Sequence, residues 1–123
     1  MKRDWDIMRS VLLEVEALNP TQTADFQFFE PYSSLDPEAD RARHALMLHE
    51  MGYLKGIAFQ TFSEGKYLKA PELTMSGADL LDSIREQPMW NQIKKVAKER
   101  GVGVAFDTLK ALAGVAASEL LKG

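Results

Sequence analysis

The chain has 123 residues, of which 46% are apolar and 27% charged, and its net charge of −3 is ordinary for one soluble globular domain. The absence of cysteine excludes disulfides, thiolate nucleophiles and cysteine-ligated zinc, and it fits a reducing cytoplasm. No apolar run approaches the roughly 18 residues that a membrane span needs, and the first residues have no signal-peptide core, so we expect a cytoplasmic protein without a membrane partner.

The first predicted helix begins at Asp4, whose carboxylate can cap the free N–H groups of the next turn, and ends at Asn19-Pro20. Residues 21–24 are expected to be a connector. A short, half-buried strand is predicted from Asp25 to Glu30, ended by Pro31. The helix carries one apolar stripe at helical spacing: Met8, Val11, Leu12, Val15 and Leu18.

A second long helix is predicted from Pro37 to Met51. Asp36 is its N-cap, Pro37 takes the first helical position, and Gly52 supplies the left-handed residue that ends it. We expect Ala45, Leu48 and Met51 to face inward and His44 to lie at the margin. Arg43, Leu46, His49 and Glu50 are then expected to point away.

Two β-rich runs follow, Gly56 to Phe62 and Tyr67 to Leu73, separated by the turn residues 63–66. In the first run Ile57, Phe59 and Thr61 alternate with Ala58, Gln60 and Phe62. Because proline cannot donate to a strand ladder, Pro71 indicates an edge strand or the end of a strand.

Three helices are predicted after the hairpin. Thr74 caps the first, Pro88 lies in the first turn of the second, and the last runs from about Ala105 to Leu121. The apolar residues expected to face inward on the first two are Leu80, Leu81, Ile84, Trp90, Ile93, Val96 and Ala97.

The order of these elements predicts an α+β, mostly helical fold. Helix, short strand, helix and β-hairpin wing form a winged-helix-like core in residues 1–73. C-terminal helices follow in residues 74–123, and the whole chain 1–123 forms a single domain. The aromatic residues Trp5, Phe26, Phe28, Phe29 and Trp90 are expected to fill the core rather than to stack on bases.

Several short motifs, moderately specific together, run along nearly the whole chain: Met1-Lys2-Arg3-Asp4, His44-Ala45-Leu46-Met47-Leu48, Glu50-Met51-Gly52-Tyr53-Leu54, Leu73-Thr74 leading to Gly77, Leu81-Asp82-Ser83-Ile84-Arg85, Trp90-Asn91, Phe106-Asp107 and Lys110-Ala111-Leu112. The chain thereby resembles a family of small, uncharacterised bacterial and phage-encoded proteins. The resemblance implies a winged-helix-like fold and a phage or prophage setting, and no catalytic residue to carry over. The chain departs from that family at His44-Ala45, where such proteins usually have His-Leu.

Residues 41–69 hold five basic and two acidic residues, a net charge of +3, so the rest of the chain carries −6. This asymmetry and the winged-helix analogy lead us to expect a non-enzymatic protein, a transcriptional regulator, that binds double-stranded DNA. The expected contacts are Arg41, Arg43 and His49 from the helix and Lys55, Lys66 and Lys69 from the wing. The alternative for such a charge run is a solvated surface with no DNA contact.

No cofactor or metal is expected. His44 and His49 are five residues apart and do not share a helix face, so they are unsuited to one metal; a packed or capping role is expected for His44. Asp79, Asp82 and Glu86 share a helix face, and without an accompanying His or phosphate loop they are expected to be a solvated acidic surface.

A second hypothesis uses the same fold as a protein–protein interaction module for a host or phage protein. The net acidity and the exposed position expected for Leu46 favour this reading.

The final helix also predicts a homodimer, because its apolar stripe is wider than one core needs. The expected interface residues are Leu109, Leu112, Ala113, Ala116 and Leu120. The alternative is that this helix closes the core of its own chain.

Overall fold

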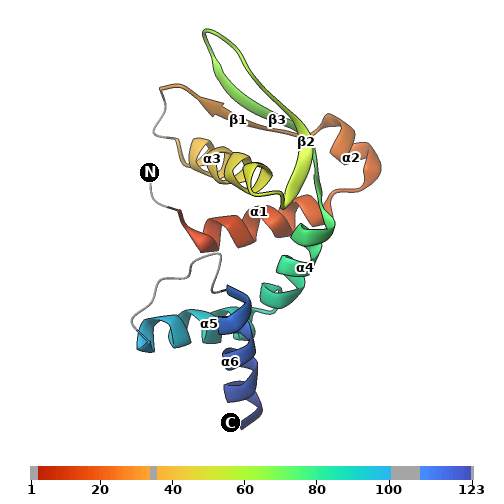
Figure 1. Ribbon diagram of the computed structural model, residues 1–123. Helices are drawn as coiled ribbons and strands as arrows, with labels where there is room; N and C mark the ends of the chain where they lie inside the picture. The colour runs from red at the N-terminus through yellow and green to blue at the C-terminus, as the bar shows by residue number, and fades with distance from the viewer. Residues whose placement is uncertain (1–2, 34–35, 101–108, 123) are drawn as a thin grey trace. The chain divides into compact units, whose positions relative to one another are not determined.

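The structure, a computed structural model, describes residues 3–33, 36–100 and 109–122 (Figure 1). The chain forms two compact units, residues 1–78 and residues 79–123. The fold is α+β and mostly helical, as expected, with one small three-stranded antiparallel sheet in the first unit. The boundary between the units lies inside a helix, a few residues beyond the expected division after residue 73.

Helix α1 (Trp5–Ala17) begins as predicted. The Asp4 carboxylate accepts hydrogen bonds from the backbone N–H groups of Asp6 and Ile7, at 2.9 and 3.3 Å. The predicted stripe is buried from Met8 to Val15, and Trp5 is buried one turn earlier. This apolar face supplies much of the core of the first unit.

Helix α2 (Pro20–Asp25) replaces the predicted connector, so that prediction is wrong. Asn19 accepts a hydrogen bond from the Gln22 N–H at 2.8 Å, and the Gln22 side chain accepts one from the Asn19 N–H at 3.0 Å. Together these bonds form a capping box. Pro20 not only ends α1 but also takes the first position of the next helix, where its missing N–H costs nothing.

The sheet contains β1 (Gln27–Pro31), β2 (Leu54–Gln60) and β3 (Gly65–Leu73), in the spatial order β1-β3-β2. The predicted strand and hairpin are present with shifted bounds, since Asp25 belongs to α2 and β2 ends at Gln60 rather than Phe62. Pro71, however, belongs to the central strand and not to an edge strand. Pairing with β1 reaches only to Lys69, and the β2 ladder is irregular between Lys55 and Ile57, so Pro71 interrupts no regular pairing.

Helix α3 (Pro37–Glu50) packs against α1 and against all three strands (Figure 1). Both predicted ends are confirmed: Asp36 accepts from the Glu38 N–H at 2.9 Å, and Gly52 has a left-handed φ of 86°. His44 is fully buried and not marginal, and Leu46 is half-buried rather than exposed. The helix lies between two layers, so little of its surface is free.

Helix α4 (Met75–Ile84) begins in the first unit, and α5 (Gln87–Glu99) and α6 (Leu109–Lys122) belong to the second. Every residue predicted to face inward on α4 and α5 is buried. Helices α5 and α6 pack together, and Leu112 and Ala116 of α6 are buried. Residues 105–108 of the predicted last helix lie outside the described residues.

At Gly77 we expect alanine to destabilise the protein, although alanine has a higher helix propensity than glycine. Gly77 lies in the first turn of α4, where Thr74 Oγ1 accepts its N–H at 3.0 Å, and a Cβ there would collide with the backbone carbonyl of Tyr53. Gly77→Ala should therefore destabilise its unit by about 1–3 kcal/mol, whereas Gly→Ala in an open helix usually stabilises by up to about 1 kcal/mol.

Gly114 is the matched control, because a Cβ there would meet nothing within 4 Å. Gly114→Ala should stabilise α6 slightly. Hydrogen exchange measured segment by segment would compare the two variants, and equal stabilisation by both would contradict the steric explanation.

Candidate functional site

The two arginines predicted to contact DNA are engaged within the protein. Arg41 donates to the Ser10 hydroxyl and to the Glu14 carboxylate of α1, each at 2.6 Å. Arg43 donates to Glu30 of β1 at 2.6 Å and to Asp40 at 3.0 Å. Both guanidinium groups are therefore used to hold α3 against its neighbours.

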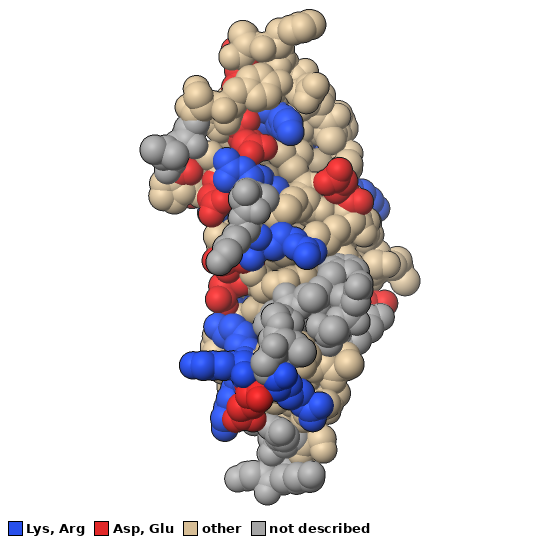
Figure 2. All heavy atoms as spheres, turned by 60° about the vertical axis from the view of Figure 1, so that its left-hand side comes forward, with Lys and Arg blue, Asp and Glu red and all other residues tan. Residues whose placement is uncertain are grey.

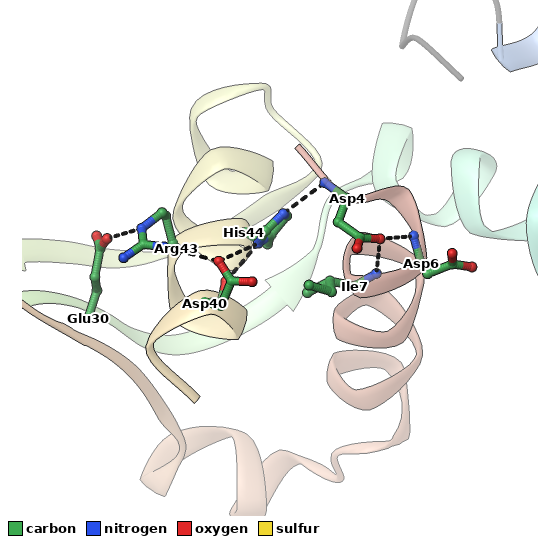
Figure 3. Close-up of polar contacts among 7 residues, drawn as sticks. All are labelled: Asp4, Asp6, Ile7, Glu30, Asp40, Arg43 and His44. Atoms are coloured by element: carbon green, nitrogen blue, oxygen red, sulfur yellow. Dashed lines mark hydrogen bonds and ion pairs between the residues drawn. The ribbon is translucent and has the colours of Figure 1, made fainter. Parts of the chain in front are cut away.

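His44 joins α3 to the start of α1 (Figure 3). Its Nε2 accepts the backbone N–H of Asp4 at 2.9 Å, and its Nδ1 lies 2.7 Å from the backbone carbonyl of Asp40. A carbonyl can only accept, so the proton of the neutral ring must be on Nδ1. The ring is fully buried and both nitrogens are satisfied, which confirms the packed, capping role predicted for this histidine.

Replacing His44 by Ala should destabilise the first unit by about 2–4 kcal/mol, because it leaves a cavity and removes the hydrogen bond from the Asp4 N–H. His49→Ala on the same helix is the control and should cost less than about 1 kcal/mol, since His49 is only half-buried. Urea denaturation followed by circular dichroism measures both, and similar losses for the two variants would contradict the assigned role.

The remaining predicted DNA contacts do not share one surface. Lys66 and Lys69 are exposed and form no ion pair within the described part of the chain, but they are three residues apart on β3 and project from opposite sheet faces. Lys55 Nζ is 3.6 Å from a Glu72 carboxylate oxygen, and His49 and Lys66 line one groove. On the face drawn in Figure 2, basic side chains are interspersed with acidic ones.

One face of the sheet is open, and we call Phe29, Ile57, Phe59, Tyr67 and Lys69 the open sheet face. Phe29, Tyr67 and Phe59 stand directly opposite one another on the three strands. Their rings form a ladder, with centroids 4.5 Å apart for Phe29 and Tyr67 and 4.8 Å for Tyr67 and Phe59. Phe59 remains 44% exposed and Ile57 61% exposed.

The opposite face is the covered one. Phe28 and Leu68 face each other across β1 and β3 and are buried, and Arg43 of α3 reaches Glu30 on this same face. Helix α3 contacts the outer strand β2 but leaves Ala58 and Gln60 exposed. A groove of about 430 Å³ results, with Leu46, Met47 and His49 on its helix side and Ala58, Gln60 and Lys66 on its strand side.

Sequence reasoning missed the open sheet face. It assigned Phe29 to the core, whereas the side chain is half-buried in the ladder. The sequence did contain a sign of this exposed apolar face. The run from Gly56 to Phe62 has no charged residue among the side chains that point to either face of the strand. A strand with one solvated face normally shows polar residues at every second position.

The pKa of Tyr67, on the open sheet face, depends on its hydrogen bond to Glu64. Tyr67 Oη donates to a Glu64 carboxylate oxygen at 2.8 Å. This hydrogen bond raises the pKa of Tyr67 above its ordinary value, with smaller contributions from burial and from the Glu64 charge.

Because the folded protein holds the Tyr67 proton more tightly than the unfolded chain, this contribution to stability is present below the ordinary tyrosine pKa. It is lost as the pH rises through the higher folded value. Glu64→Gln should lower the pKa of Tyr67, measured by NMR of the labelled tyrosine ring carbons, with Tyr32 as the internal reference. An unchanged Tyr67 pKa would show that Glu64 is not the cause.

The residues predicted for a helix-mediated dimer lie on α6. Leu112 is 5% exposed and Ala116 fully buried within the single chain. The side chains of Leu109, Ala113 and Leu120 lie outside the described residues. The burial of Leu112 and Ala116 favours a core role for this stripe, and the dimer through α6 stays a prediction.

The described residues hold no group of three His, Asp or Glu side chains placed to bind a metal ion. None of their helices has the length and apolar character required to cross a membrane.

Comparison with known proteins gives two matches. Residues 2–103 match the model of a family described as "Hypothetical protein (DUF2513)". An "Uncharacterized protein" of Haemophilus influenzae (strain ATCC 51907 / DSM 11121 / KW20 / Rd) is 29% identical over 121 residues, covering 98% of this chain and 99% of the relative. No solved structure matches the chain.

Proposed function

The chain belongs to the DUF2513 family of hypothetical proteins, and we propose that this member is a binding protein rather than an enzyme, which engages a partner protein through its open sheet face. The observation that carries the proposal is the exposure of apolar side chains on the outer hairpin. Ile57 is 61% and Phe59 44% exposed, and Phe62 at the hairpin tip is fully exposed. Contiguous apolar surface on a small protein is typical of a docking site.

The side chains around this surface suit a protein partner. The aromatic ladder is rigid, since each ring is held by the next, and rigid aromatic rings lose little entropy on binding. Lys69 borders the ladder on β3 and forms no ion pair among the described residues, so it can meet an acidic side chain at the rim. The proposal places the protein in the cytoplasm, in line with its lack of cysteine.

Affinity capture from bacterial lysate with mass spectrometry tests this function. The double variant Ile57→Ser, Phe59→Ser should lose the captured partner, because it removes apolar contact area, and it should remain folded because both side chains are exposed. The matched control is Lys66→Glu, which changes charge in the same hairpin but on the opposite sheet face, and should retain most of the partner. Equal retention by the control and the double variant would contradict docking on the open sheet face.

Duplex DNA binding is the second candidate, as a winged-helix-like protein of phage or prophage origin. The exposed Lys66 and Lys69 on the hairpin favour it, because neither forms an ion pair with another described residue and lysines there can contact phosphates as a wing does. Against it stand the internal ion pairs of Arg41 and Arg43.

Fluorescence anisotropy with a labelled random-sequence duplex at low salt separates the two candidates. DNA binding that is lost in Lys66→Glu, Lys69→Glu and kept in Ile57→Ser, Phe59→Ser would favour the second candidate. These lysines are better probes than Arg43, because Arg43→Glu would place a carboxylate beside Glu30 and disturb the fold.

A further inference from the structure

The outer edge of the sheet is unprotected from Gly56 onward, beyond Lys55 and the bulge that follows it. Within the described residues β2 pairs with β3 alone, and Gly56 to Gln60 are exposed throughout. The segment from Gly56 to Phe62 contains neither a charged residue nor a proline. Edge strands usually carry such residues to prevent pairing with another chain, and β1, at the other edge, ends in Glu30 and Pro31.

The hydrogen-bond pattern identifies which backbone groups of β2 are available. The Thr61 N–H donates to Gly65 O at 2.9 Å, so in the alternating antiparallel ladder the pairs Phe59–Tyr67 and Ile57–Lys69 are also hydrogen-bonded. The backbone groups of Ala58 and Gln60 therefore point away from β3. This leaves a donor and an acceptor at each of two alternate residues, which is the arrangement that an added strand requires.

We propose that two copies of this chain pair antiparallel through β2, about a two-fold axis at Phe59, and join their sheets into one of six strands. The inference goes beyond the proposed function and does not require the partner protein. Ala58 then exchanges both backbone hydrogen bonds with the partner's Gln60, and Gln60 does the same with the partner's Ala58. The pairing is self-complementary, as a two-fold interface must be.

Side chains support this register. Phe59 meets the partner's Phe59 in a non-hydrogen-bonded pair, where opposite side chains are closest. The aromatic ladder then continues from Phe29 through Tyr67 and Phe59 into the second sheet, and the exposed Phe59 and Ile57 become covered at the junction. No like charges oppose each other, because the paired segment is uncharged and Lys66 and Lys69 lie one strand inward.

Proline at position 58 tests the pairing with little effect on the hairpin. The Ala58 N–H points outward, so Ala58→Pro removes a hydrogen bond to the second copy and none to β3. Light scattering at tens of micromolar should give twice the 13.8 kDa chain mass for the natural sequence and one chain mass for the variant. Circular dichroism should show an unchanged fold.

A second variant keeps the test decisive if Ala58→Pro fails to fold. Phe59→Lys places two like charges opposite each other at the two-fold axis and should also give monomers, with no backbone change. Leu121→Glu is the control for the alternative dimer, because Leu121 of α6 is 90% exposed, and it should leave the mass unchanged.

A monomeric natural protein would overturn the inference, as would a dimer that only Leu121→Glu dissociates. If the dimer is not found, partner capture still tests the proposed function independently. A partner captured by a monomer and lost in Ile57→Ser, Phe59→Ser would support the function while excluding the dimer. A dimer that captures no partner would support the pairing through β2 and exclude the proposed function.

Discussion

The first unit depends on the way in which α3 is held between α1 and the sheet. His44 is the buried centre of that arrangement, since one ring nitrogen accepts the N–H of Asp4 and the other bonds the Asp40 carbonyl. Arg43 continues the chain of contacts to Glu30 on β1 (Figure 3). A buried polar ring is costly unless both of its nitrogens are satisfied, so the partners of His44 favour one placement of α3 against the start of α1.

Because its polar side chains form contacts inside the protein, α3 has few groups available to bind a partner. Arg41 and Arg43 are the cations best placed along the helix, and both are bound to carboxylates of neighbouring elements. A guanidinium engaged in this way must break its internal bonds before it contacts DNA. Eleven of the fourteen residues of the helix are buried or half-buried, which reduces its free surface further. Accessible basic and apolar side chains lie instead on the hairpin, at Lys66, Lys69, Ile57 and Phe59.

A sheet of three strands covered on one face explains why the hairpin carries so much exposed apolar area. Phe28 and Leu68 are buried on the covered face, while the ladder of Phe29, Tyr67 and Phe59 lies on the open one. Stacking between the rings lowers their exposure without removing it. Both the proposed partner and the proposed second copy would bury what remains: the former on the face, the latter at the edge.

Local signals in the sequence determined the helices and the hairpin. Asp4 and Asp36 are N-caps, Gly52 ends α3, and the apolar stripe of α1 is buried, because capping, left-handed glycine and helical periodicity act over a few residues. The capping box of α2 is also a local signal. It was missed because Asn19-Pro20 was interpreted only as the end of α1, whereas it also begins α2. Long-range pairing was decided only by the tertiary structure. It placed β3 at the centre despite Pro71, buried His44 beneath α1, and directed the arginines of α3 inward. Each of these depends on a partner at least a dozen residues away in the chain, and no spacing within one segment encodes where such a partner will lie.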